Sequence, residues 1–147
     1  MTKNIQGITI SPLKIISDDR GSVMHMLRND NQIFEQFGEI YFSTIFKSKI
    51  KAWHLHKEAT LNYACVYGKV KLVLFDERKK SETYGRYQEL ILSIENYSLI
   101  TIPPNIWNGF KGIHKGHSII ANCLNLPHNE KEMVRLSTED KRFNYKW

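Results

Sequence analysis

The chain has 147 residues, of which 41% are hydrophobic and 24% charged. This composition is typical of a globular protein and unlike that of a disordered chain, and we expect one domain over residues 1–147. Twenty-one Lys and Arg against fifteen Asp and Glu give a formal net charge of +6. Such an excess favours an anionic partner, which could be nucleic acid, a membrane surface or a phosphorylated small molecule.

Apolar residues alternate with the period of two that half-buried β-strands show. Val70, Leu72 and Leu74 illustrate this pattern. In chain order, strands are expected at 39–46, 51–56, 61–67, 69–76, 88–93, 98–102 and 118–124. Short strands separated by turn residues predict an all-β sandwich or closed barrel. Short helices are expected only around 31–36 and 129–136.

The element pattern limits the kinds of partner. It contains no helix-turn-helix, no zinc finger and no basic helix, so we expect no nucleic-acid partner. The sequence also contains no amphipathic basic helix and no apolar run of ~18 residues, so we expect no membrane partner. It shows no signal-peptide pattern, and we therefore expect a cytoplasmic protein. Cys65 and Cys123 lie in apolar runs and are expected to be buried, reduced thiols.

Two histidines, His54 and His56, are two residues apart on an expected strand. Their side chains therefore share one face, which is compatible with a metal site, a general base or a polar wall. The pattern resembles the first motif of the cupin superfamily, and Gly68 also fits it. However, Thr60 or Leu61 stands where that motif has Glu, and Asn108 stands where a second motif has His. With two of four ligands missing, we expect no metal and no other cofactor.

The segment from Asp76 to Gly85 reads on its own as a charged turn with an Asp76–Arg78 pair. Together with other short motifs it makes the chain resemble the dTDP-4-dehydrorhamnose 3,5-epimerase family, a branch of the cupins. The matching motifs, in family order, are Asp19-Arg20-Gly21, the strand ending in His56, Asp76-x-Arg78-x-x-Ser81-x-Thr83-x-Gly85, Ile102-Pro103, Gly109-Phe110 and Tyr145-x-Trp147. The resemblance covers about residues 15–147 and implies a cupin jelly-roll barrel that forms a homodimer.

The resemblance also implies a reaction. Members of this family act on 4-keto sugars linked to a nucleotide diphosphate, in deoxysugar and surface-polysaccharide biosynthesis such as that of lipopolysaccharide. A base removes a proton alpha to the ketone, and an acid returns a proton to the opposite face. His56 occupies the position of the base, and Asp76 is our candidate for the carboxylate that orients it. Substrate-binding roles are expected for Arg20 (at the phosphates), Trp53, His54, Tyr63, Arg78 and Asn108, with Tyr41 as a further aromatic candidate.

Several positions depart from the family pattern. Trp53 replaces a phosphate-binding Arg, and the segment 119–129, where the family has its catalytic Tyr, offers only His128 as an acid–base side chain. The family's C-terminal Asp would come after Trp147. We therefore expect His128 as the opposite-face acid, with either epimerisation at a single centre or isomerisation of the keto sugar. The alternatives are a binding protein for carbohydrates or nucleotide sugars without catalytic activity, and a metal-dependent cupin enzyme.

Overall fold

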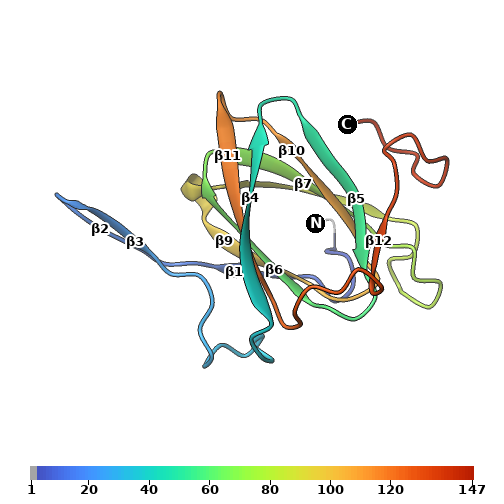
Figure 1. Ribbon diagram of the computed structural model, residues 1–147, viewed down its shortest axis with the longest axis horizontal. Helices are drawn as coiled ribbons and strands as arrows, with labels where there is room; N and C mark the ends of the chain where they lie inside the picture. The colour runs from blue at the N-terminus through green and yellow to red at the C-terminus, as the bar shows by residue number, and fades with distance from the viewer. Residues whose placement is uncertain (1–2) are drawn as a thin grey trace.

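The computed structural model describes residues 3–147 and confirms the predicted all-β class. Two five-stranded antiparallel sheets face each other (Figure 1). The first contains, in spatial order, β1 (Thr9–Pro12), β9 (Ser98–Ile102), β6 (Leu61–Tyr67), β11 (His117–Leu124) and β4 (Glu39–Phe46). The second contains β12 (Met133–Arg135), β5 (Ile50–His56), β10 (Trp107–Gly112), β7 (Lys69–Phe75) and β8 (Tyr87–Ser93). A separate hairpin pairs β2 (Ile15–Asp18) with β3 (Gly21–Met24), and one 3-10 turn covers Ile94–Asn96.

The main core lies between the two sheets and follows the alternation of the strands. In β7, Val70, Leu72 and Leu74 point into this core, as the sequence pattern predicts. Val73 and Phe75 point to the outer face and are also buried. They are buried because the C-terminal segment crosses this face with Phe143, Tyr145 and Trp147, forming an aromatic cluster outside the barrel.

The prediction of two short helices is wrong. Residues 31–33 form a bend and turn, 34–36 have no regular structure, and 129–136 contain a turn followed by strand β12. β12 pairs antiparallel with β5, so that Met133 lies opposite His56 and Arg135 opposite His54. Pairing with an exposed sheet edge outweighs local helix preference here, and it brings the segment 128–135 beside the two histidines. No helix within residues 3–147 is long and apolar enough to span a membrane.

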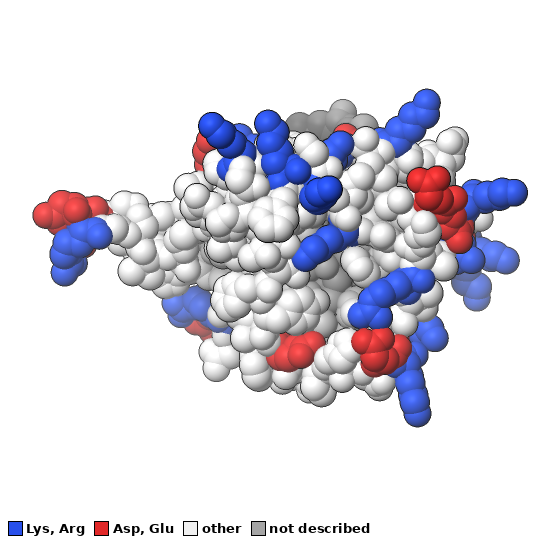
Figure 2. All heavy atoms as spheres, turned by 45° about the horizontal axis from the view of Figure 1, so that its top comes forward, with Lys and Arg blue, Asp and Glu red and all other residues white. Residues whose placement is uncertain are grey.

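The β2–β3 hairpin projects away from the barrel (Figure 1). Figure 2 shows basic and acidic side chains spread over the face in view, and the tip of the hairpin carries both signs. At this tip Arg20 pairs with Asp18 at 2.7 Å, and both side chains are exposed. The hairpin thus places the Asp-Arg-Gly motif outside the barrel.

Candidate active site

A pocket of about 250 Å³ opens beside β5 and contains the two histidines. It is lined by Tyr41, Ser43, Lys51, His54, His56, Tyr63, Phe110, His128, Met133 and Arg135. The structure therefore brings together five of the residues expected from the sequence: Tyr41, His54, His56, Tyr63 and His128.

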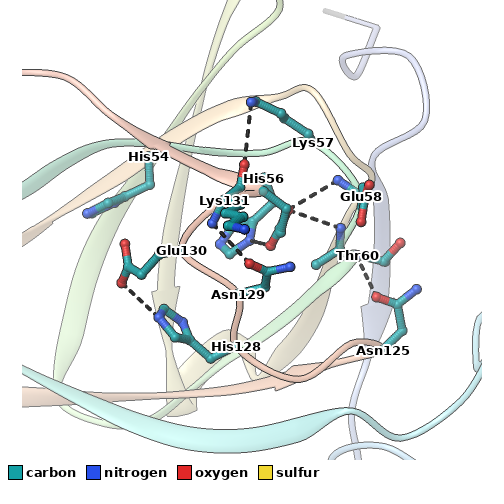
Figure 3. Close-up of polar contacts among 12 residues, drawn as sticks. His54, His56, Lys57, Glu58, Thr60, Asn125, His128, Asn129, Glu130 and Lys131 are labelled. Atoms are coloured by element: carbon teal, nitrogen blue, oxygen red, sulfur yellow. Dashed lines mark hydrogen bonds and ion pairs between the residues drawn. The ribbon is translucent and has the colours of Figure 1, made fainter.

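His56 is buried at this pocket and paired with a carboxylate (Figure 3). Its Nδ1 lies 2.5 Å from Oε1 of Glu132, whose side chain is also buried. Burial by itself raises the pKa of Glu132, but the hydrogen bonds from His56 and from the backbone N–H of Glu58 outweigh it and lower that pKa. The ionised Glu132 carboxylate accepts a hydrogen bond from Nδ1–H, so Nε2 is the ring nitrogen of His56 that can take a proton.

His54 lies on the same face of β5, two residues before His56. Burial, followed by the nearby charges of Arg135, His56 and Lys51, lowers the pKa of His54 to about 4. His54 is therefore neutral at pH 7. Its carbonyl accepts a hydrogen bond from Asn108 Nδ2, and Asn108 Oδ1 accepts one from the Tyr63 hydroxyl. Asn108 thus holds β5 and Tyr63 at the inner wall of the pocket, where a cupin would carry a metal-binding His.

His128 reaches the pocket from the segment between β11 and β12, and Figure 3 shows it next to Glu130. Its Nε2 lies 2.7 Å from Glu130 Oε1. The other oxygen of Glu130 accepts a hydrogen bond from Arg135 Nη1 at 2.7 Å. The pocket therefore holds two histidine–carboxylate pairs, a buried one at His56 and an exposed one at His128.

Asp76 does not orient His56, because Glu132 occupies that position. Asp76 is fully buried in the turn after β7, where its two oxygens accept hydrogen bonds from Arg78, Ser81 and Thr83. Burial favours the neutral acid, but these hydrogen bonds outweigh it and hold the pKa of Asp76 well below its usual range. Arg78 also donates to the carbonyl of Gln6. The motif is therefore a structural turn, and neither Asp76 nor Arg78 lines the pocket.

The expected role of Trp53 in substrate binding is also wrong. Adjacent residues of a strand point to opposite faces, so Trp53 lies behind His54 on the outer side of the sheet. It is fully buried there and stacks on Phe143 at a centroid distance of 4.5 Å. Trp53 thus anchors the C-terminal segment and has no access to the pocket.

The Asp76→Asn variant should lose stability by about 2–4 kcal/mol, because it removes charge-assisted hydrogen bonds from a buried site. The native pKa of Asp76 is lowered, so its stabilising effect is present above the ordinary carboxyl pKa near 4 and is lost as the pH falls. Urea unfolding should therefore show a difference from wild type at pH 7 that shrinks near pH 3. A variant of wild-type stability that had lost activity would restore a catalytic role for Asp76.

Comparison with known proteins shows the family of this chain. The family model described as dTDP-4-dehydrorhamnose 3,5-epimerase matches residues 2–147. The chain belongs to this family. It is 29% identical over 121 residues to a probable low-salt glycan biosynthesis epimerase, Agl13, of Haloferax volcanii, covering 81% of this chain and 78% of that protein. It is 26% identical to the spore coat polysaccharide biosynthesis protein SpsL of Bacillus subtilis, covering 97% and 96%.

A solved structure confirms the cupin barrel of this epimerase-family chain. It is the dTDP sugar isomerase from Desulfovibrio desulfuricans G20, with a TM-score of 0.94 and 38% identity, and the match covers 97% of this chain and 92% of that one. Family membership makes the chain an enzyme of the epimerase or isomerase type. Within residues 3–147, no group of three or more His, Cys, Asp and Glu side chains is arranged to hold a metal ion.

Sequence reasoning missed three charged residues of the candidate site, namely Glu132, Lys51 and Arg135. Glu132 and Arg135 lie in a segment expected to be helical, and only the pairing of β12 with β5 shows that they flank the two histidines. One feature of the sequence could have indicated Glu132. His128, Glu130 and Glu132 are spaced two residues apart, and in an extended chain such residues point to the same side. Lys51 reaches the pocket through an irregularity in β5 that no residue pattern marks.

Proposed function

We propose that this protein epimerises one carbon of a 4-keto sugar linked to a nucleotide diphosphate. The observation that carries the proposal is the buried His56–Glu132 pair at the pocket. His56 Nε2 takes the proton from a carbon next to the ketone, and the electron pair moves onto the ketone oxygen as an enolate. Glu132 holds the Nδ1–H and stabilises the imidazolium that forms. Deprotonation thus needs no group outside this pair.

The second half of the reaction returns a proton to the opposite face of the same carbon. We propose His128 as this acid, because it lines the same pocket from a different segment and Glu130 orients its ring. Tyr41, whose hydroxyl accepts a hydrogen bond from Asn122, also lines the pocket and is the matched comparison. With one base and one opposing acid, the site supports a single inversion.

The experiment that tests this function follows proton exchange by NMR in deuterated buffer, over a panel of dTDP-, UDP- and GDP-linked 4-keto sugars. We expect deuterium to enter one member of the panel, next to its ketone, and an epimer to accumulate. A binding protein without catalysis would show affinity for a panel member and no exchange. If the protein binds members of the panel but none of them takes up deuterium, the proposal is contradicted. Elemental analysis of the protein, purified without added metal, tests the metal-dependent alternative.

We also propose that the protein forms a homodimer through surfaces that the barrel leaves open. β4 is the edge of its sheet, and its outward-facing Phe42 and Phe46 are 63% and 68% exposed. The projecting hairpin adds Ile16 and Val23, which are at least half exposed. Exposed apolar residues along an unpaired strand edge are typical of protein interfaces. Cytoplasmic location stays a prediction, which fractionation of the source cells tests.

Sedimentation equilibrium should show a dimer for the wild-type protein and a shift toward monomer for Phe42→Ser, because this change removes apolar area from the proposed interface. The matched control is Ile91→Ser on β8, which removes a half-exposed apolar residue from the other sheet and should stay dimeric. A monomeric wild-type protein would overturn this proposal.

A further inference from the structure

The diphosphate of the proposed substrate needs cationic partners, and the positions expected from the sequence do not supply them in the barrel. Arg20 lies on the projecting hairpin and pairs with Asp18. Arg78 is held in the turn by Asp76, and Trp53 stands at the family's other Arg position on the outer face. In the described part of the chain, the Lys and Arg side chains that line the pocket are Lys51 and Arg135.

A bulge in β5 turns Lys51 toward the pocket. Asn108 of β10 pairs with His54, whereas Phe110 pairs with Lys51, so β5 carries one extra residue at this point. This extra residue places Lys51 and His54, three positions apart, on the same face. The adjoining β10 backbone needs glycine here, since a Cβ on Gly109 would lie 2.3 Å from that of Ala52. Bulges of this kind redirect side chains next to active sites.

Arg135 reaches the same pocket through strand pairing, because it lies directly opposite His54 on β12. It is paired with Glu130, and its side chain is 51% exposed. Lys51 is exposed too, and its Nζ donates to the Thr44 carbonyl at 2.7 Å. Partners of this exposed type are weakly held in water, so an incoming phosphate can replace them.

The charges are ordered by depth within the pocket. His56 is 5% exposed at its base, whereas both cations lie near solvent. Neutral His54 lies between them, and the nearby charges of both cations help to lower its pKa. A nucleotide sugar would therefore enter with its sugar toward His56 and its diphosphate near the mouth of the pocket.

We infer that Lys51 and Arg135 form the anion subsite that binds the diphosphate of the substrate, in place of the arginine whose position Trp53 occupies. The inference rests on the proposed function. Arg135 exchanges Glu130 for one phosphate group, and Lys51 exchanges the Thr44 carbonyl for the other. Both new contacts are charge-assisted hydrogen bonds to phosphate oxygens.

Calorimetric titration with inorganic pyrophosphate and with dTDP tests this subsite without requiring turnover. We expect Lys51→Gln and Arg135→Gln each to weaken the binding of both probes by about tenfold or more. Binding of uncharged thymidine should not change. Lys49→Gln is the matched control, since Lys49 precedes β5 and does not line the pocket. In turnover, the variants should raise KM more than they lower kcat.

Wild-type affinity for pyrophosphate and dTDP in both variants would overturn the subsite, as would a wild-type protein that binds neither probe. Loss of binding only in Arg20→Gln would assign the diphosphate to the hairpin and would also overturn it. Proton exchange separates this inference from the proposed function. If the wild-type protein catalyses exchange and both variants bind the probes as tightly as wild type, the subsite alone is rejected. If the variants weaken probe binding but the wild-type protein catalyses no exchange, the proposed function alone is rejected.

Discussion

The His56→Asn variant should lose solvent-deuterium incorporation into the keto-sugar substrate by about 10³-fold or more. Asn has a size close to that of the imidazole and can still bond to Glu132, but it cannot accept a proton at neutral pH. The neighbouring imidazole, His54, is a poor replacement, because burial and the nearby charges lower its pKa to about 4. NMR detection of exchange in deuterated buffer, with purified variant and wild type compared at equal concentration, gives the measurement.

Glu132→Gln is the companion variant for the same prediction. It keeps the shape of the side chain and a hydrogen bond to His56, but it removes the charge that stabilises the imidazolium. We expect a fall in kcat of about 10²-fold with little change in KM. Undiminished exchange in His56→Asn would reject the assignment of the base, and an unchanged kcat in Glu132→Gln would reject the positioning role of the carboxylate.

The His128→Asn variant should separate exchange from inversion. His56 can still remove a proton, exchange it with solvent and return a deuteron to the face from which it came. The opposite face then lacks its donor, so the substrate becomes labelled while the epimer fails to accumulate, with a loss of inversion of about 10²-fold or more. The same NMR experiment measures both quantities, since label and configuration give different signals.

Tyr41→Phe is the matched control for His128→Asn. It removes a pocket hydroxyl and its hydrogen bond with Asn122 while keeping the ring. We expect this variant to invert its substrate at a rate within a few fold of wild type. The opposite pattern, with inversion kept in His128→Asn and lost in Tyr41→Phe, would move the acid to β4.

The fold class could be predicted from the sequence because the alternation of apolar and polar residues along a strand shows which of its faces is buried. The segments around β4, β6, β7, β9 and β11 all carry this pattern, and each lies within a residue or two of the expected bounds. The segment 129–136 does not carry it, because β12 is three residues long and sits at a sheet edge. Its conformation is determined by its pairing with β5, which is a tertiary contact.

Local spacing predicted the geometry of the candidate site only for His54 and His56, whereas Tyr63 and His128 were expected from the family resemblance. His54 and His56 share a face because of strand geometry, and the structure places both in the pocket. Asp76 and Arg78 carry a recognisable motif, but the motif specifies a buried turn. Glu132 comes from a distant segment, and Lys51 depends on a bulge formed against Gly109. Spacing along one strand cannot reveal contacts of either kind.

The number of labelled carbons tests the central claim most directly. Wild-type protein should be allowed to convert its preferred 4-keto nucleotide sugar to equilibrium in deuterated buffer, and the product should be examined by NMR. The arrangement of one buried base, His56, and one opposing acid, His128, predicts deuterium at a single carbon next to the ketone, with inversion there. Label at carbons on both sides of the ketone with two inversions, or no label at all, would contradict it.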